Sequence, residues 1–238
     1  MKNKIILSPY LNLDRLKNPK DDFKNCIKIL KKKIYLKEKK IIDIGCANGE
    51  FIDYFISKYK QNFFCGVDVN KNYLKVAKKN GKLKKVKFIK KNFKNLRLNF
   101  LYDVAICMGV SHSIKDINIL IAKMLSFVKK KGIVVVDGFF NEYDIDTQIF
   151  FKDYSQKKNY WQNDFNHFSK KKIINLLKKK KIKNYSFHDS FLKVNIPKNH
   201  KIKPHHFVWT EILGHKKIVT NGTNLILKRK FLVIKKPQ

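Results

Sequence analysis

The sequence predicts an α/β protein in which one mostly parallel sheet carries helices on both of its faces. Two observations support this prediction. Along residues 40–136, short continuous apolar runs alternate with segments whose apolar residues recur at the spacing of an amphipathic helix. The runs contain few polar positions, which is typical of parallel strands that are buried on both sides. With 238 residues, 44% of them apolar, the chain suits one domain with a sizeable core, or one domain with an insertion.

The first half of the chain is the more regular half. Residues 21–36 form a predicted lead-in helix, because Phe23, Ile27 and Leu30 fall on one helical face. Four units of strand and connection follow. The predicted strands cover residues 40–44, 62–69, 86–89, 102–108 and 133–136, and the predicted helices cover residues 49–60, 70–80 and 116–130.

Beyond residue 138 the pattern loosens. Residues 141–168 are rich in aromatic and acidic side chains, and we interpret them as an insertion or lid. A helix over residues 169–180 follows, and residues 185–194 and 225–234 are strand candidates that we expect to form an antiparallel edge of the sheet. No regular structure is predicted for residues 197–224. The chain then divides into an N-terminal segment (1–38), a ligand-binding core (39–140), the insertion (141–168) and a C-terminal part that completes the sheet and adds a substrate-side loop (169–238).

The charge of the chain is strongly positive. The formal net charge is +36, and a dense cationic surface can bind nucleic acid by releasing counterions from phosphates. Only three of the 54 basic residues, Arg15, Arg97 and Arg229, are arginine, although the guanidinium group is the better ligand for phosphates and guanine edges. Lysine, asparagine, isoleucine and phenylalanine are abundant together, which is typical of an AT-rich coding sequence. We therefore favour solvated lysine faces over a polyanionic partner, and leave the second possibility open.

The sequence also bears on the cellular setting. It contains no apolar run long enough to span a membrane and no pattern of a secretory signal at its start, which favours a cytoplasmic protein. Cys26, Cys46, Cys65 and Cys107 form no CxxC pair, and reduced core thiols are expected. The histidines at 200, 205, 206 and 215 crowd one region without a regular ligand spacing, so no metal site is predicted.

Two spaced signals describe a nucleotide site. The predicted strand at 40–44 contains Asp43 and opens into a turn with Gly45 and Gly49, where backbone N–H groups can approach a ligand at the start of a helix. The next predicted strand ends in Asp68, whose carboxylate can accept hydrogen bonds from both hydroxyls of a ribose. The glycine spacing is not the G-x-G-x-x-G of nicotinamide enzymes, which makes that class less suitable.

These residues resemble those of class I S-adenosylmethionine-dependent methyltransferases over about residues 39–136. The resemblance implies a Rossmann-like doubly wound sheet, S-adenosyl-L-methionine as cofactor, and residues 39–140 as its binding core. The turn Asp43-Ile-Gly-Cys-Ala-Asn-Gly49 corresponds to the family's turn beneath the methionine part of the cofactor. Asn92 stands where the family usually has an acid that accepts from the adenine amino group. The cofactor-binding residues implied in this way are Asp43, Gly45, Cys46, Ala47, Gly49, Asp68, Val69, Asn92, Phe93 and Met108.

The segment after the fourth predicted strand, Met108 to Ser113, would face both the cofactor and the methyl acceptor. His112 is the candidate base, because an imidazole titrates near neutral pH, although a histidine here can also simply pack beneath the following helix. The chain lacks the Asn-Pro-Pro-Tyr motif of amino-methylating DNA enzymes, and Cys107 lies within an apolar run, unlike a cytosine-C5 nucleophile.

The resulting prediction is in-line methyl transfer to O or N of a small molecule, or of a sugar-linked or lipid-linked acceptor. Two other functions stay open. The first is an RNA-modifying methyltransferase or basic RNA-binding protein, which the charge suggests. The second is a non-catalytic module with the same fold that binds a nucleoside.

Overall fold

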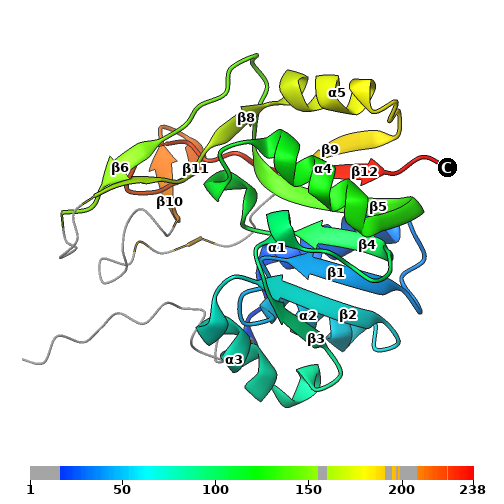
Figure 1. The fold of residues 1–238 in the computed structure, drawn as a ribbon. Coiled ribbons are helices and arrows are strands. Elements are labelled where there is room, and N and C mark those ends of the chain that lie inside the picture. Colours follow the sequence, from blue (N-terminus) through cyan, green and yellow to red (C-terminus); the bar gives the residue numbers. More distant parts are fainter. Residues whose placement is uncertain (1–16, 155–159, 191–194, 197, 199–207, 224) are drawn as a thin grey trace, which may run out of the picture.

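The computed structural model describes residues 17–154, 160–190, 195–196, 198, 208–223 and 225–238 (Figure 1). An eight-stranded sheet crosses the molecule in the order β3-β2-β1-β4-β5-β12-β9, and β8 pairs with β5 off this path. The pairs from β3 to β5 are parallel, whereas β12 runs antiparallel to both β5 and β9. The strands are β1 (Lys40–Ile44), β2 (Phe63–Asp68), β3 (Lys87–Lys90), β4 (Tyr102–Cys107), β5 (Val128–Asn141), β8 (His167–Ser169), β9 (Tyr185–Asp189) and β12 (Arg229–Lys235).

Helices cover both faces of this sheet, and each face has its own apolar core. The apolar runs supply both cores because successive side chains of a strand point to opposite faces. In β1, for example, Ile41 belongs to the core beneath α1 and α2, while Ile42 belongs to the core beneath α4 and α5. The helices are α1 (Asp21–Lys31), α2 (Glu50–Lys58), α3 (Lys71–Lys79), α4 (Ile117–Phe127) and α5 (Lys170–Lys179). The predicted fold, a mostly parallel doubly wound sheet, is confirmed.

The C-terminal strand candidates form the predicted antiparallel edge of the sheet. Residues 185–194 supply the outermost strand β9 and residues 225–234 supply β12, and residues 191–194 lie outside the described residues. β12 lies between β5 and β9, and Phe231 to Ile234 are buried on both of its faces. An interior strand of this kind can keep an apolar run without the polar alternation that an edge strand shows.

Two hairpins stand apart from the sheet and form what we call the hairpin lobe. They are β6–β7, with β6 (Phe150–Lys152) and β7 (Trp161–Asn163), and β10–β11, with β10 (Trp209–Leu213) and β11 (Lys216–Thr220). Both hairpins are anchored on one apolar cluster that includes Phe139, Ile149, Phe165 and Val219. The hairpin β10–β11 falls within residues 197–224, for which the sequence predicts no regular structure.

The four cysteines are free and buried, as predicted from the sequence. None of the helices in the described ranges is long and apolar enough to cross a bilayer. Of the clustered histidines, His200, His205 and His206 lie outside the described residues.

Candidate functional site

The turn after β1 is held in an unusual backbone conformation. Gly45, Ala47 and Gly49 have φ angles of 77°, 47° and 80°, all in the left-handed region. Gly45 cannot be replaced without movement, because a Cβ atom there would lie 2.2 Å from Cγ2 of Val110. The backbone N–H groups of Gly45 and Cys46 donate to the carbonyl of Val67 at 2.7 and 3.1 Å, so the turn is fixed to the end of β2.

Asp68 connects this turn to the loop after β2. Its Oδ2 accepts a hydrogen bond from the backbone N–H of Ala47 at 2.9 Å, and its Oδ1 accepts one from the N–H of Asn70 at 2.8 Å. A carboxylate oxygen can accept two hydrogen bonds, so each oxygen keeps capacity for one more donor. The neighbouring Val69 is 61% exposed. The carboxylate is therefore oriented by the backbone and still able to bind a pair of hydroxyls.

Two buried polar side chains lie at the same turn with unsatisfied atoms. Asp43 is 2% exposed and its Oδ1 has no hydrogen-bond partner among the described residues, and the same holds for Oδ1 and Nδ2 of the fully buried Asn48. Burial, with smaller contributions from Asp68 and Asp137, raises the pKa of Asp43 to about 8. Unsatisfied buried polar atoms are rare in folded proteins and are typical of places where a polar ligand binds. The acceptor oxygens of Asp43 and Asn48 suit the ammonium group of a ligand, and the donor Nδ2 of Asn48 suits a carboxylate, so the amino-acid end of a ligand fits these atoms.

Asn92 and Phe93 follow β3 and form the start of the 3-10 turn η4 (Phe93–Asn95). Oδ1 of Asn92 accepts from the backbone N–H of Lys94 at 3.0 Å, so this side chain caps the turn, while Phe93 is buried in the core. The N–H of Lys91 donates to the carbonyl of Asp68 at 3.1 Å, which places this loop beside the end of β2. Asn92 is exposed, and its oxygen and amide group retain capacity for a ligand.

The segment after β4 is anchored on β5. Met108 is half-buried against the core beneath α1 and α2, and the N–H of Gly109 donates to Oδ1 of Asp137 at 2.6 Å. Gly109 has a φ of 69°, and a Cβ atom there would meet open space. The Ser111 hydroxyl donates to the carbonyl of Asp137. The backbone after β4 is therefore held in place while one side of it faces an opening.

His112 lies in the 3-10 turn η5 (Ser111–Ser113) and faces the hairpin lobe. Its Nε2 is 3.4 Å from Oδ1 of Asp164, and its ring stacks on Phe165 with ring centroids 4.9 Å apart. The Ser113 hydroxyl also donates to Oδ1 of Asp164, at 2.7 Å, which holds the carboxylate in position. This arrangement is a histidine–carboxylate pair, in which the acid can orient the imidazole and stabilise its protonated form.

Aromatic rings form the wall beside this pair. Phe139 lies 5.9 Å from both His112 and Phe165 and 5.3 Å from His167, measured between ring centroids. Nε2 of His167 is buried and has no hydrogen-bond partner in the part of the chain that the structure describes. Burial lowers the pKa of His167, which favours its neutral form. Sequence reasoning missed Asp164, Phe165 and His167, because nothing in residues 141–168 distinguishes these side chains from their neighbours.

The predicted residues thus fall into two groups at one edge of the sheet. Asp43 and Asp68 lie at the carboxyl ends of β1 and β2, Asn92 follows β3, and His112 follows β4 on the other side of β1. The chain leaves β1 in one direction to β2 and β3 and later continues in the other direction with β4 and β5. Ligands of open parallel sheets bind at this kind of switch point, outside the carboxyl ends of the strands.

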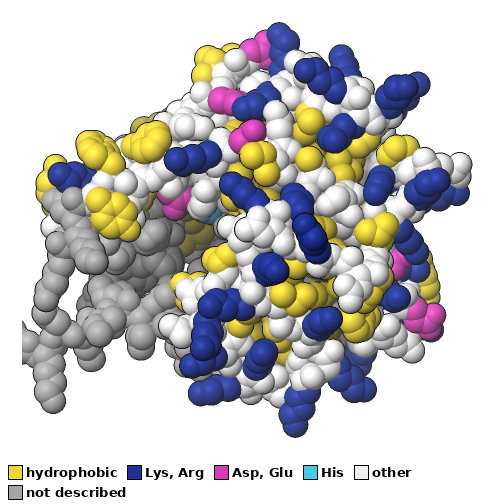
Figure 2. Space-filling view, viewed as in Figure 1, with side chains coloured by type: hydrophobic (Ala, Val, Ile, Leu, Met, Phe, Trp, Pro, Cys, Tyr) yellow, Lys and Arg dark blue, Asp and Glu magenta, His cyan; other side chains and the backbone are white. Residues whose placement is uncertain are grey.

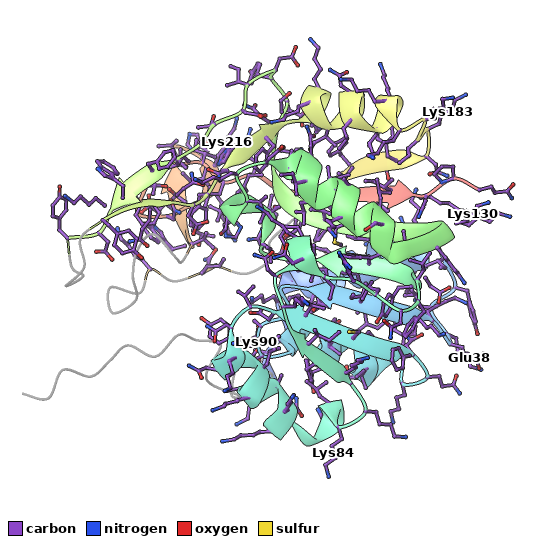
Figure 3. All side chains as sticks on the ribbon, in the orientation of Figure 1. Glu38, Lys84, Lys90, Lys130, Lys183 and Lys216 are labelled. Carbon is purple, nitrogen blue, oxygen red and sulfur yellow. The ribbon has the colours of Figure 1, made fainter. Side chains whose placement is uncertain are left out.

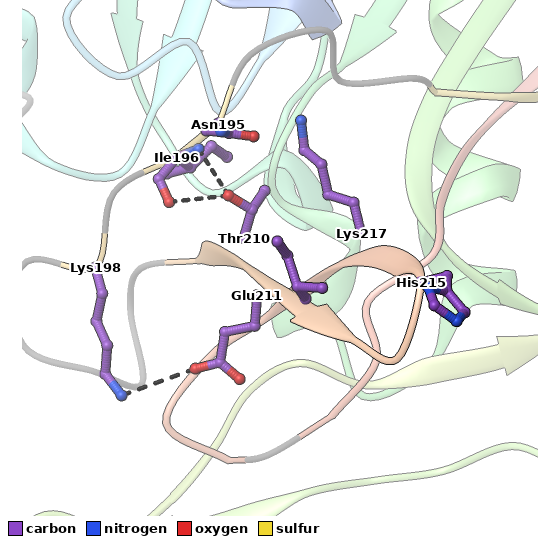
Figure 4. A pocket seen from close by; sticks show the side chains of 8 residues that line it. Asn195, Ile196, Lys198, Thr210, Glu211, His215 and Lys217 are labelled. Atoms are coloured by element: carbon purple, nitrogen blue, oxygen red, sulfur yellow. Dashed lines mark hydrogen bonds and ion pairs between the residues drawn. The ribbon is translucent and has the colours of Figure 1, made fainter.

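A further pocket lies on the hairpin lobe and contains none of the predicted site residues (Figure 4). Its polar groups are mostly engaged with each other. Thr210 exchanges hydrogen bonds with the backbone of Ile196 at 3.1 and 3.3 Å, and Lys198 lies 3.8 Å from Glu211. We assign no role in the site to this pocket.

Comparison with known proteins identifies the class. The family described as "Methyltransferase domain" matches residues 36–190, which is more than half of the chain. The chain therefore belongs to this methyltransferase domain family. A search of curated protein sequences found no match.

Several solved structures share the fold. An S-adenosylmethionine-dependent methyltransferase from Clostridium acetobutylicum is 14% identical with a TM-score of 0.56, and 96% of each chain is covered. The 1,6-didemethyltoxoflavin-N1-methyltransferase of Burkholderia thailandensis, crystallised with 1,6-didemethyltoxoflavin and S-adenosylhomocysteine, is 11% identical with a TM-score of 0.58; the match covers 94% of this chain and 82% of that one. Magnesium protoporphyrin IX methyltransferase from Synechocystis, with bound S-adenosylmethionine, is 11% identical with a TM-score of 0.53 and coverage of 90% and 78%.

Other matched structures are covered less fully by this chain, which spans 56% of YjhP from E. coli and 35% of a coclaurine N-methyltransferase. At these identities the structural likenesses show the fold alone. Together with the family match, they confirm a methyltransferase domain with the predicted Rossmann-like fold.

Proposed function

We propose that this protein transfers a methyl group from S-adenosylmethionine to an oxygen or nitrogen atom of a small molecule, or of a sugar-linked or lipid-linked acceptor. One observation carries the proposal. The loops suited to the cofactor lie at the same edge of the sheet as the pair formed by His112 and Asp164. β1 and β4 are neighbours in the sheet, and the loops lie on the β1 side while the pair lies on the β4 side. Methyl transfer from a sulfonium needs mainly alignment and exclusion of water, which such an arrangement supplies.

On the cofactor side, Asp68 would accept hydrogen bonds from the ribose hydroxyls, and the turn through Gly45, Cys46, Ala47 and Gly49 would pass beneath the methionine part. The carboxyl of Asp43 would face the cationic end, where a nearby positive charge favours its ionised form. Asn92, Phe93, Val69 and Met108 would border the adenine and the methionine chain. The cofactor supplies the electrophilic methyl group; the protein residues bind and orient.

On the acceptor side, His112 would take the proton that a neutral hydroxyl or amine loses, with Asp164 as the residue that positions its imidazole. Phe139 and Phe165 would pack against the acceptor and exclude water from the reacting atoms. The aromatic walls favour an acceptor with a flat apolar part. The toxoflavin precursor and the porphyrin of the two methyltransferases named above are acceptors of this general kind in those proteins.

The four free, buried thiols support a reducing compartment, and we include a cytoplasmic location in the proposal.

Calorimetric titration with S-adenosylmethionine tests the cofactor site. The variant Asp68→Asn keeps an oxygen acceptor for the N–H of Ala47 but loses the negative charge, so we expect affinity to fall by roughly 1.5–3 kcal/mol, the range for charged hydrogen bonds. The control Asp189→Asn removes an equal charge from an exposed position on β9 and should bind like the wild type. Equal affinities for Asp68→Asn and the control would refute the assigned cofactor site.

Labelled methyl donor and fractionated cell extract then test the acceptor class. We expect label in the small-molecule or lipid fraction. Label in RNA alone would favour the RNA-modifying alternative. Tight cofactor binding with no labelled product in any fraction would favour the non-catalytic module.

A further inference from the structure

One stretch of the chain contains basic residues and no acidic residue. Between Asp68 and Asp103 there is neither aspartate nor glutamate. All the basic side chains in this stretch are exposed. We call them together the basic edge: Lys71, Lys75, Lys78, Lys79, Lys82, Lys84, Lys85, Lys87, Lys90, Lys91, Lys94 and Arg97.

The charges of the basic edge differ from those of several lysines elsewhere in the protein, which form ion pairs with acidic side chains. On α5, Lys170 lies 2.7 Å from Glu142 and Lys172 lies 2.6 Å from Asp146. Near the other end of the strands, Lys129 lies 2.5 Å from Asp103. Within the described residues, no side chain of the basic edge forms an ion pair or a hydrogen bond. Its positive charges are therefore not compensated by ion pairs in the described structure, which builds a positive potential over this part of the surface.

The fold gathers these charges at one end of the molecule. They lie on α3, on the turn η3 (Gly81–Leu83), on β3 and on η4, and β3 is the edge strand of the sheet. In Figure 2 lysine and arginine side chains crowd the lower part of the molecule, over α3 and β3, and Figure 3 labels Lys84 and Lys90 there. The hairpin lobe, which carries Asp164, is on the other side of β4 (Figure 1).

We propose that the basic edge docks the protein on nucleic acid through the phosphate backbone, without reading the bases. A lysine neutralises a phosphate as a point charge, whereas bidentate binding of phosphates and base recognition both rely on the planar fork of arginine, of which this stretch has one; the charges therefore suit docking by electrostatic attraction rather than base recognition. No large apolar side chain between residues 70 and 97 is exposed. A bilayer-binding surface normally adds such side chains to its charge, so a hydrated polyanion fits this surface better than a lipid membrane.

This nucleic acid is a docking partner and not the methyl acceptor. Residues 141–168, which provide Asp164 and Phe165 to the acceptor side, contain five acidic residues and three lysines. Three of these acids pair with lysines of α5, so this surface is nearly balanced and attracts a phosphate backbone less than the basic edge does. The inference therefore does not rest on the proposed acceptor, and it holds or fails separately from the methyltransferase activity.

The experiment compares two variants of equal charge. In the first, Lys78, Lys82, Lys84 and Lys85 of the basic edge are changed to glutamine. In the control, Lys178, Lys179, Lys180 and Lys183, which are also exposed and form no ion pair in the described structure, are changed to glutamine. The probe is a fluorescent RNA duplex, and its affinity is measured by anisotropy from about 50 to 200 mM salt, the range over which backbone binding changes steeply.

We expect the basic-edge variant to bind RNA at least roughly tenfold more weakly at about 100 mM salt. Its salt slope should become shallower by about 0.9 for each phosphate that the variant no longer neutralises. The control should bind less than about threefold more weakly, because only the global charge changes. Changing the same four lysines to arginine should retain binding, which separates removal of charge from failure to fold. Both glutamine variants should bind S-adenosylmethionine like the wild type.

Equal reductions in the two glutamine variants would show that net charge alone attracts RNA, and would overturn the proposal. So would an unchanged affinity of the basic-edge variant. The same series run with vesicles containing phosphatidylserine addresses the lipid alternative: tighter binding to vesicles than to RNA, abolished only in the basic-edge variant, would overturn the proposal and assign this surface to a membrane instead.

Discussion

The proposed cofactor side and the proposed acceptor side of this protein are built in different ways. On the cofactor side, the turn after β1 is fixed by the neighbouring β2 through Val67 and Asp68, so adjacent units of the chain complete one another. On the acceptor side, His112 meets Asp164, which belongs to the segment between β7 and β8, beyond β5. The first kind of site depends on local sequence and strand order. The second depends on how a separate lobe packs, which local sequence does not determine.

The proposed cofactor side and acceptor side also differ in surface charge. The loops near the cofactor lie beside the uncompensated lysines of the basic edge, whereas the acids of residues 141–168 pair with lysines of α5 and with His112. A protein with a formal charge of +36 therefore keeps a nearly balanced surface where we place the acceptor. This favours uncharged or weakly charged acceptors there and leaves polyanions to the other end of the sheet.

The largest effect should come from breaking the pair on the acceptor side. Because a positioned general base contributes about 10²- to 10⁴-fold, His112→Ala should lower kcat by that factor while leaving cofactor affinity unchanged. Asp164→Asn should lower kcat by a smaller factor, because His112 loses the carboxylate that positions its imidazole. Turnover with the acceptor found by the labelling screen measures both.

A double variant separates a catalytic pair from a packing role. If Asp164 acts through His112, the effects are not additive, and His112→Ala with Asp164→Asn should be no slower than His112→Ala alone. His215→Ala, at an exposed position on the turn of β10–β11, is the matched histidine control and should leave kcat unchanged. Unchanged turnover in a folded His112→Ala variant would remove the base from the mechanism and leave the ring as part of the wall with Phe165.

The next effect concerns stability on the cofactor side. The pKa of Asp43 is about 8 in the folded protein because of burial, against an ordinary value of 3.8, so between these values the folded state binds more protons than the unfolded state. Stability therefore falls as pH rises from about 4 to 8, and the burial cost is fully present above the folded pKa. Asp43→Asn removes this titration.

We accordingly expect Asp43→Asn to raise the Tm of the cofactor-free protein by several degrees at pH 8 and by much less at pH 5. Asp137, whose pKa is also raised by burial, is present in both proteins, so the comparison reports the titration of Asp43 together with its repulsion from Asp137. Thermal unfolding at the two pH values measures the difference. The same variant should bind S-adenosylmethionine more weakly, since it loses the carboxylate that would face the cationic end. A Tm gain that is equal at both pH values would mean that Asp43 stays ionised when buried.

Most of the cofactor side could be predicted from the sequence, because its signals are local. The apolar runs specify strands, the glycine turn specifies the connection after β1, and Asp68 marks the end of a strand. Each signal extends over only a few residues, and the order of the parallel strands then brings them together. The boundaries of β1, β2 and β4 differ from the predicted ones by no more than about one residue at most ends. The position of Asn92 after the third predicted strand predicts that this side chain binds adenine. The same position does not predict that Asn92 accepts a hydrogen bond from the backbone N–H of Lys94.

The acceptor side could not be predicted to the same degree. Residues 141–168 have no period of two or of 3.6, so neither β6–β7 nor the pairing of His112 with Asp164 follows from them. The run of β12 predicts a strand, but its place between β5 and β9 depends on pairing with two strands that lie earlier in the chain. These features depend on contacts between segments that are distant in sequence.

The smallest expected effect tests how the glycine turn is held. Ala47 has a φ of 47°, in the left-handed region, where backbone strain in an L-residue costs about 1–2 kcal/mol of folding free energy. Glycine avoids this strain, but it loses more conformational entropy on folding, at a cost of roughly 0.5–1 kcal/mol. The N–H of Ala47 bonds to Asp68 in either case, because it belongs to the backbone. Ala47→Gly should therefore raise the free energy of unfolding by up to about 1 kcal/mol, or Tm by about 2–4 °C. Ala77→Gly, within α3, should lower stability by about 1 kcal/mol and is the matched control. If Ala47→Gly destabilised the protein as Ala77→Gly does, the turn would have to gain more from the Cβ atom of Ala47 than it loses in backbone strain.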